Sequence, residues 1–405
     1  MKVLSFVEGA NPRRGGLGLV GLPMIAKSLA DRGHQEVLVI GGRVNPGRES
    51  LVQPDADTAM QQKSGAGSFG ILTFAAWERW AFAPAILWRL CRYARDADFI
   101  TLHSLYSFPV LAGYLLARLY RKPYGLWPHG VLLPVQRRIS IGKKRIYDWL
   151  VARRILSQAS ALFFAALGER EEAYKLGLTP PSVVIPHGFD ACEFERLPPR
   201  GQFRAKYLDG QQGPLVLYLS RLNAKKGLDL LVKAFALVIN RMPNARLAIV
   251  GSGDPPSFES EVKGWLHEHG VENRTVMPGL LVGHERLEAF ADADVFVFPS
   301  EAENFGFAMF EAMASRIPVV VSNTLDYAAE VQRYEAGLVV RRDSQEFATA
   351  IVKLLGDADL RQRMGRNGLQ LARAYSWETC GEKIERTIQC ILQGIPLPAD
   401  LTLEK

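Results

Sequence analysis

Two glutamates, Glu303 and Glu311, lie eight residues apart just after the apolar run VFVFP. If a helix begins near Gly306, Glu303 lies in the loop before it and Glu311 lies on its second turn. Each carboxylate can accept hydrogen bonds from paired hydroxyls, so this spacing suits a ligand with two polyol ends. Gly306 would also let backbone N–H groups approach a sugar or a phosphate. Glu301, on the same loop, is interpreted as an ordinary surface residue.

Two cations follow an earlier apolar run, LVLYL. Arg221 comes at the end of this run, and Lys226 comes just before the next helical pattern. In an open parallel α/β sheet, ligands bind beyond the carboxyl ends of the strands. A guanidinium can grip phosphate oxygens in bidentate fashion, and an ammonium neutralises their charge. The pair therefore predicts a clamp for a diphosphate, whereas Lys225 is expected to face solvent.

Histidines also follow predicted strands. His103 comes after FITL, and His129 lies in Pro128-His129-Gly130 after the run GLW. His129 is the better candidate for a functional residue, because Gly130 frees the backbone around it. His187, in the segment PHGFD, is interpreted as a structural or lining residue.

A glycine pattern near the N-terminus raises a different possibility. Residues 16–21 match G-x-G-x-x-G, so a nicotinamide-dependent oxidoreductase has to be considered. Eight residues separate this pattern from the first strand, however, and the second strand ends in two glycines where a ribose-binding acid is expected. The loop remains a candidate anion site at a helix N-terminus, with Gly16 as its candidate residue.

Metal binding is not predicted. The pairs Asp96-x-Asp98 and Asp292-x-Asp294 resemble metal-binding motifs, but both precede strands, at the edge opposite to the one where ligands gather. They are interpreted as helix-to-strand turns. The four cysteines are scattered and include no Cys-x-x-Cys pair, which favours a reduced, cytoplasmic compartment.

Short apolar runs alternate with amphipathic helical patterns in both halves of the chain. The predicted strands are 3–7, 37–40, 99–102, 124–127, 161–165, 183–185, 215–219, 246–250, 275–277, 295–298 and 318–322. Such alternation predicts an α/β fold with two Rossmann-like, doubly wound parallel sheets. The expected domains are 1–195 and 196–375. The aperiodic stretch 194–214 is expected to be the linker, and a C-terminal helix in 376–405 is expected to pack back on the first domain.

Composition and charge exclude several classes. The chain has 405 residues, of which 48% are hydrophobic and 22% charged, so collagen, coiled coil and wholesale disorder are excluded. The net charge is about +10 over residues 1–200 and about −3 over the rest, and segment 118–154 holds ten basic residues and one acid. With the aromatic stretch 77–93, this favours an anionic partner such as a membrane surface. Nucleic acid is not predicted, because no binding motif accompanies the charge.

The ordered set of motifs resembles the retaining glycosyltransferases of the GT-B fold, family four, also called glycosyl transferases group 1. The matching segments are Gly15–Gly18, Pro128–Gly130, Pro186–Asp190, Arg221 with Lys226, Gly251–Gly253, Glu303 with Glu311, Pro318, Glu330 and Gly337. His187 departs from the family pattern, which usually has asparagine there.

The resemblance implies two domains facing a central cleft, with residues 1–195 binding the acceptor and residues 196–375 binding the nucleotide-sugar donor. It also implies roles for single residues. Arg221 and Lys226 would hold the donor diphosphate. Glu311 would bind ribose hydroxyls, and Glu303 would bind hydroxyls of the transferred sugar. The remaining implied contacts are the backbone of Phe305 and Gly306 with sugar or phosphate, Met277 to Leu280 with the base, Gly251 with the donor, His129 with the donor sugar, and Gly16 with phosphate or acceptor.

The expected activity is metal-independent hexosyl transfer, with retention, from a nucleoside-diphosphate sugar to a saccharide or lipid-linked acceptor. No separate cofactor is expected. Bacterial surface polysaccharide or glycolipid synthesis is the expected setting, with the enzyme cytoplasmic and peripheral on the inner face of the cell membrane. A nucleotide-sugar epimerase of the same fold and a non-catalytic sugar-nucleotide binder remain alternatives. The donor base, the sugar and the acceptor stay open.

Overall fold

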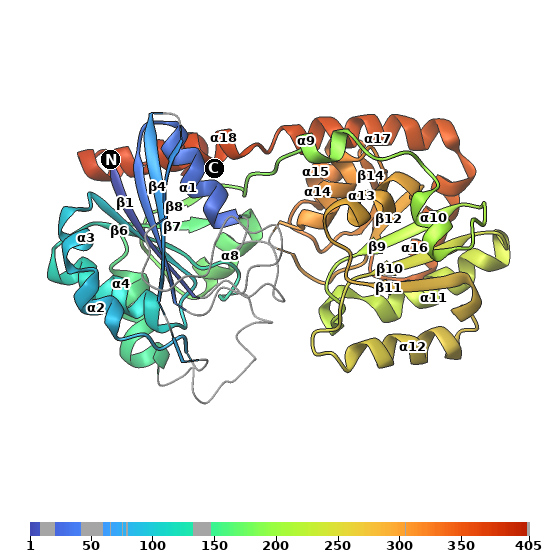
Figure 1. The fold of residues 1–405 in the computed structure, drawn as a ribbon, viewed down its shortest axis with the longest axis horizontal. Coiled ribbons are helices and arrows are strands. Elements are labelled where there is room, and N and C mark those ends of the chain that lie inside the picture. Colours follow the sequence, from blue (N-terminus) through green and yellow to red (C-terminus); the bar gives the residue numbers. More distant parts are fainter. Residues whose placement is uncertain are drawn as a thin grey trace. The chain divides into compact units, whose positions relative to one another are not determined.

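The computed structural model describes residues 1–8, 21–41, 60–64, 66–74, 76–77, 80–132, 147–303 and 305–402. The chain forms two compact units (Figure 1). Unit 1 consists of Met1–Gly188 and of the segment from Trp377 on, and unit 2 is Phe189–Ser376. The two ends of unit 2 meet, since the Phe189 N–H donates to the Tyr375 carbonyl at 2.6 Å. Each unit is a Rossmann-like α/β layer structure, and this confirms the predicted fold class.

The sheet of unit 1 has eight strands in the order β3-β4-β2-β1-β5-β6-β7-β8. The strands are β1 (Lys2–Glu8), β2 (Gln35–Gly41), β3 (Met60–Ser64), β4 (Gly67–Phe74), β5 (Phe99–His103), β6 (Tyr124–Trp127), β7 (Ala161–Phe164) and β8 (Ser182–Val184). All neighbours are parallel except β3 and β4, which form an antiparallel pair at the edge. This pair was not predicted, because β3 reads MQQKS and lacks the apolar run of a buried strand.

The helices of unit 1 include two from the C-terminal segment of the chain, α18 and α19. The helices are α1 (Leu22–Asp31), α2 (Ala85–Arg89), α3 (Cys91–Asp96), α4 (Phe108–Leu119), a π-helical turn (Asp148–Ala152), α7 (Arg153–Ser157), α8 (Leu167–Lys175), α18 (Trp377–Gln393) and α19 (Ala399–Thr402). Helix α18 packs closely on α1, where the Ser28 hydroxyl donates to the Trp377 carbonyl at 2.8 Å. A side chain at Gly381 would collide with Ser28, so this contact requires glycine. Among the described residues, no helix combines the length and apolarity needed to cross a bilayer.

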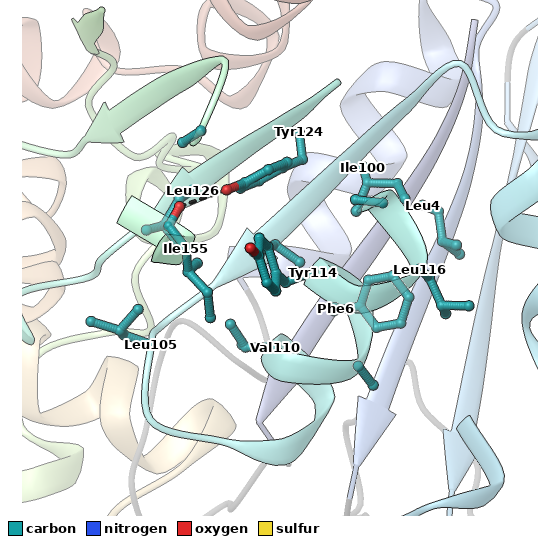
Figure 2. Packing of buried hydrophobic residues seen from close by; sticks show 14 of the residues in the cluster. Leu4, Phe6, Ile100, Leu105, Val110, Tyr114, Leu116, Tyr124, Leu126 and Ile155 are labelled. Carbon is teal, nitrogen blue, oxygen red and sulfur yellow. Dashed lines mark hydrogen bonds between the residues drawn. The ribbon is translucent and has the colours of Figure 1, made fainter. Parts of the chain in front are cut away.

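Helix α4 provides much of the core of unit 1 (Figure 2). Its buried side chains pack against Leu4 and Phe6 of β1 and Ile100 of β5. The helix approaches the sheet closely at Gly113, where an added Cβ would lie 2.6 Å from side-chain carbons of Phe6. Each fully buried large apolar side chain contributes about 1.5–3 kcal/mol to the free energy of unfolding. This core therefore fixes the strands whose ends carry the candidate histidines.

The sheet of unit 2 has six strands in the order β11-β10-β9-β12-β13-β14. The strands are β9 (Leu215–Leu219), β10 (Arg246–Val250), β11 (Thr275–Gly279), β12 (Val295–Phe298), β13 (Val319–Ser322) and β14 (Gly337–Val340). Every neighbouring pair is parallel. The carboxyl ends of all six strands therefore meet at one edge, and the loops that follow them gather there.

Helices connect these strands throughout unit 2. They are α9 (Cys192–Glu195), α10 (Gln202–Tyr207), α11 (Leu228–Arg241), α12 (Phe258–Glu268), α13 (Gly283–Asp292), α14 (Phe307–Ala314), α15 (Ala328–Arg333), α16 (Ser344–Gly356) and α17 (Ala358–Arg373), with 3₁₀ turns at Ala224–Lys226 and Glu272–Arg274. Helix α14 begins directly after Gly306, which confirms the predicted start of the helix between Glu303 and Glu311.

The stretch 194–214 is not the plain linker that its composition suggested. It contains α10, whose Arg204 is only 4% exposed. The backbone N–H groups of Gly201 and Arg204 donate to the Asp292 carboxylate at 2.6 and 2.9 Å. The Arg204 guanidinium also reaches Asp294 at 3.4 Å. The prediction of a linker failed because its polar residues have partners far along the chain, and both aspartates are occupied within the protein.

Candidate functional site

A lysine and a glutamate from different loops meet in unit 2. Lys226 lies in the 3₁₀ turn after β9, and Glu303 lies in the loop after β12. The Lys226 ammonium forms an ion pair with the Glu303 carboxylate, and their side chains are only 10% and 17% exposed. The Ser300 hydroxyl donates to the same carboxylate oxygen at 2.7 Å, and Lys226 lies over the Phe298 ring at 5.2 Å. Two of the predicted site residues are therefore in direct contact.

The backbone of the two loops explains this contact. The Glu301 N–H donates to the Lys225 carbonyl at 2.8 Å, which ties the loop after β12 to the turn after β9. Asn223 caps this turn by accepting from the Lys225 N–H at 3.2 Å. Gly227 follows with φ +68°, and a Cβ there would lie 2.4 Å from the Pro299 carbonyl oxygen. Glycine at this position thus allows the approach that brings Lys226 to Glu303.

Arg221 lies at the same edge of the sheet but points to a different partner. Its guanidinium donates to Asp254 at 2.8 Å, and its side chain is 41% exposed. Gly251, directly after β10, has φ +141°, and a Cβ there would lie 1.9 Å from the Ser220 carbonyl oxygen. The ends of β9 and β10 therefore touch through this glycine. The structure gives Gly251 a packing role, and its predicted contact with a ligand stays a prediction.

Glu311 is held by an arginine that sequence reasoning missed. Arg286 of α13 donates to Glu311 at 3.1 Å and to both oxygens of Glu193 at 3.1 Å, and its guanidinium stacks over the Phe194 ring at 5.1 Å. Burial raises the pKa of Glu311, and the positive charge of Arg286 opposes this rise. A single arginine in an amphipathic helix gives no sequence signal, and its partner lies 25 residues away.

The start of α14 presents backbone rather than side chains. Phe305 is buried and stacks on Phe310, with ring centroids 4.2 Å apart, so its side chain belongs to the core. Gly306 has φ +80° and precedes the first helical turn, whose N–H groups and positive dipole end can receive an anion. Met277 lies on β11, and Leu280, directly after this strand, is exposed.

In unit 1, three histidines stack beside one tryptophan. The rings of His103, His129 and His187 lie within a stack that includes Trp127, and His103 Nδ1 is 2.9 Å from His129 Nε2. Burial lowers the pKa of His103 to about 3 and that of His187 to about 4. It also lowers the pKa of His129 well below its usual value, with help from the two other histidines. All three rings are therefore neutral near pH 7.

A buried glutamate fixes the turn that holds His129. The Glu169 carboxylate accepts from the Gly130 N–H at 2.5 Å and from the Ala165 N–H at 3.2 Å. His129 has φ +52° and Gly130 has φ +80°, so two successive residues have left-handed backbone. Glu169 was not predicted as a site residue, because it lies 39 residues from the turn that it holds.

Some predicted features lie outside the described residues. These are Gly16 with its glycine-rich loop, Asn304, and the part of the basic segment from 133 to 146. Within the described part of the chain, no group of three or more histidine, cysteine, aspartate or glutamate side chains is arranged to hold a metal ion.

Comparisons with known proteins identify the family. The family "Glycosyl transferases group 1" matches residues 199–371, and "Glycosyl transferase 4-like domain" matches residues 20–188. A GDP-mannose-dependent alpha-(1-6)-phosphatidylinositol monomannoside mannosyltransferase of Mycobacterium tuberculosis is 31% identical over 58% of this chain and 63% of its own length. The phosphatidyl-myo-inositol mannosyltransferase of Mycobacterium leprae is 28% identical over 77% of this chain and 79% of its own.

Solved structures share the fold. The Anabaena protein HepE, in complex with UDP-glucose, has a TM-score of 0.74 at 20% identity, over 96% of this chain and 99% of its own. Sucrose-phosphate synthase from Thermosynechococcus elongatus has a TM-score of 0.72 at 21% identity, over 97% and 99%. At such identities the likeness shows the fold alone. The chain spans only about three fifths of the length of the M. tuberculosis relative.

Proposed function

We propose that this chain, which belongs to the group 1 glycosyltransferases of the GT-B fold, transfers a hexosyl group from a nucleoside-diphosphate sugar with retention of configuration. The single observation that carries the proposal is the contact between Lys226 and Glu303. Binding a diphosphate requires cations, and binding a sugar requires hydrogen-bond acceptors. Here a lysine ammonium and a glutamate carboxylate are paired at the carboxyl edge of a parallel sheet.

The chemistry follows from the charge on the leaving group. When the glycosidic bond to the diphosphate breaks, negative charge develops on the departing oxygen. Lys226, Arg221 and the N-terminal turn of α14 supply fixed positive charge and dipoles for this oxygen. We therefore propose that no divalent metal ion is needed. Because Lys226 also binds Glu303, the group that neutralises the phosphate positions the carboxylate that binds the sugar hydroxyls.

Retention is assigned to attack on the face from which the diphosphate leaves. In this step the acceptor oxygen bonds to the anomeric carbon as the bond to phosphate breaks, and the hydroxyl proton passes to the departing phosphate. A covalent intermediate on Glu303 is less favoured, because one of its oxygens already accepts from both Lys226 and Ser300. An oxygen so engaged is a weaker nucleophile.

Relatives support a lipid-linked or saccharide acceptor. Several are named as enzymes that mannosylate phosphatidylinositol or its mannoside, and one is named sulfoquinovosyl transferase. We infer that the acceptor here is a glycolipid or lipid-linked saccharide of cell-surface synthesis. The named donors include GDP-mannose, and a structural neighbour was crystallised with UDP-glucose, so either base remains open.

Donor binding tests the proposal directly. We expect one of GDP-mannose, UDP-glucose or UDP-N-acetylglucosamine to raise the melting temperature, also in the presence of EDTA. At 100 times Kd, a ligand that binds only the native state adds about 2.7 kcal/mol to the free energy of unfolding. Release of nucleoside diphosphate should require an acceptor, whereas an epimerase would release it without one. If no nucleotide sugar stabilises the protein while NADH does, the oxidoreductase alternative is correct.

Unit 1 also has a surface suited to an anionic membrane. Trp77, Trp88 and Trp149 are 75%, 64% and 71% exposed. Ring contacts link the region of Trp77 to that of Trp149. Trp77 packs on Phe82 at 5.5 Å, and Phe82 and Trp80 both pack on Phe108, at 4.7 and 5.6 Å. Trp80 also packs on Tyr147, two residues before Trp149, at 5.9 Å. Basic residues surround them in the sequence, namely Arg89, Arg92, Arg95, Arg153 and Arg154. Exposed tryptophan beside arginine is typical of a membrane interface, so we propose peripheral attachment to anionic lipid.

The double variant Trp88→Ala, Trp149→Ala tests this attachment. We expect its binding to vesicles of phosphatidylglycerol and phosphatidylcholine at low salt to fall about tenfold, because two interfacial side chains are lost. Co-sedimentation measures the effect. Leu392→Ala, an exposed apolar residue of α18, is the control and should bind like the wild type. Equal binding by all three proteins, or no binding by the wild type, would contradict the proposed attachment.

A further inference from the structure

A line of buried hydrogen bonds crosses the sheet of unit 1 and ends at His129. Ser5 on β1 donates to Glu36 on β2 at 2.6 Å, and Thr101 on β5 donates to Ser5 at 2.6 Å. The Thr101 hydroxyl also lies 3.2 Å from His103 Nε2. His103 Nδ1 in turn lies 2.9 Å from His129 Nε2. Four hydrogen bonds therefore join Glu36 to His129.

The parallel register puts this line on one face of the sheet. Ser5 pairs with Thr101, and Val7 pairs with His103, so residues two apart on each strand face the same side. On the next strand Glu36 pairs with Val3, two residues before Ser5. Ser5, Glu36, Thr101 and His103 are all buried. The line is thus shielded from water as far as His129, which is half-buried.

Burial of the Glu36 carboxyl is energetically unfavourable. Burial raises its pKa from 4.5 to about 7, and the hydrogen bond from Ser5 only partly offsets this. Its second carboxylate oxygen has no hydrogen-bond partner within the part of the chain that the structure describes. A buried carboxyl that is only half satisfied destabilises the fold compared with an apolar side chain. A role beyond packing would explain its presence.

The number of available protons decides which group donates in each hydrogen bond of the line. Above its pKa of about 7 the Glu36 carboxyl is ionised and only accepts hydrogen bonds, so the single hydroxyl proton of Ser5 points to Glu36. The Thr101 hydroxyl proton must then point to Ser5. Thr101 can therefore only accept from His103, whose Nε2 must carry the proton. Because the His103 ring is neutral, its Nδ1 carries none.

The same count decides the state of His129. Since His103 Nδ1 is bare, the contact between the two rings requires a proton on His129 Nε2. His129 is also neutral, so its own Nδ1 is a bare acceptor. This Nδ1 is buried and has no hydrogen-bond partner among the residues that the structure describes.

We propose that Glu36 is a positioning residue, which acts along this line to hold His129 in the Nε2–H tautomer. The bare Nδ1 then accepts a hydrogen bond from a hydroxyl of the sugar substrate, an assignment that rests on the proposed function. A fixed acceptor has a consequence for specificity. Phosphate oxygens are acceptors too, so they are repelled at this position, whereas a hydroxyl can turn its proton toward the ring.

The tautomer can be measured in the ligand-free enzyme. With ¹⁵N-labelled histidine at pH 8, above the pKa of Glu36, two-bond ¹H–¹⁵N correlation spectra distinguish the two tautomers of each ring. We expect the Nε2–H form at His103 and His129, with the signals of His129 assigned from their loss in His129→Gln. A wild-type His129 with its proton on Nδ1 would overturn the proposal without any variant being made.

Removing the hydroxyl in the middle of the line gives the second test. Thr101→Val keeps the shape and removes the hydroxyl, so we expect an Nδ1–H form of His129 to appear. We also expect kcat/KM to fall on the order of fivefold, the value of one hydrogen bond. Affinity for free nucleoside diphosphate should not change, because it has no sugar for His129 to contact. Thr101→Ser should restore the wild-type spectrum.

Thr387→Val is the matched control, since Thr387 is an equally buried threonine of unit 1 outside the line. It should leave both the spectrum and kcat/KM unchanged. An unchanged His129 tautomer in Thr101→Val would overturn the role of the line. If the tautomers behave as expected but no nucleotide sugar binds, the line is supported and the proposed function is what fails.

Discussion

Lys226→Met is expected to lower kcat by about 10²–10³-fold, the usual loss when one group that stabilises a developing oxyanion is removed. Methionine keeps an apolar stem against the Phe298 ring, so the loop has no reason to unfold. The variant loses the positive charge for the departing diphosphate and the cation that holds Glu303. Steady-state kinetics with donor and acceptor would measure the effect.

The neighbouring lysine provides a control for general charge effects. Lys225 has the same charge, and its carbonyl, not its ammonium, joins the two loops by accepting from Glu301. Lys225→Met should therefore retain kcat within about a few-fold of the wild type, because the ammonium of this half-buried lysine forms no ion pair within the described part of the chain. Equal losses in the two variants would mean that net charge matters and that Lys226 has no special place in the site.

Glu311→Gln is expected to weaken donor binding by about 10- to 100-fold, because a hydrogen bond to a charged group contributes about 1.5–3 kcal/mol. Glutamine keeps the size of the side chain but loses the charge that Arg286 neutralises. The predicted partner is the ribose, which both the nucleotide sugar and the free nucleoside diphosphate contain. Calorimetric titration should therefore show the same loss for both ligands.

Glu303→Gln separates the two ends of the donor. Its predicted partner is the transferred sugar, so its effect should be large for the nucleotide sugar and small for the free nucleoside diphosphate. Glu301→Gln, at an exposed residue of the same loop, should bind both ligands normally. If Glu311→Gln binds nucleoside diphosphate like the wild type, Glu311 does not belong to the nucleotide site.

Apolar pattern predicted the strands that are buried on both faces. Strands β9, β12 and β13 read as nearly continuous runs of leucine, valine and phenylalanine, because helices cover a parallel sheet on both sides. The polar elements escaped this criterion. Strand β3 pairs only at an edge, and α10 is held by aspartates some ninety residues further along the chain. Strand β3 and helix α10 form because of contacts with distant partners, which their own composition does not reveal.

The same distinction applies to the candidate site. Residues in loops directly after strands, such as Lys226 and Glu303, could be found because strand ends meet at one edge of a sheet. Arg286, Glu169 and Glu36 could not, since each acts on a residue 25 to 39 positions away through a single contact. Spacing along a sequence carries no signal for such contacts, and only the fold brings them together.

The way the chain passes between its two units matters for engineering. Phe189 and Tyr375 are hydrogen-bonded at the two ends of unit 2, and Gly188 lies against Trp377 in unit 1. Residues 189–376 are thus an insertion whose entry and exit are neighbours on both sides of the junction. Such a segment can be replaced by the corresponding piece of a related enzyme without stretching the host. The proposed function places the nucleotide sugar in unit 2, so chimaeras made at these two junctions are expected to change the nucleotide preference.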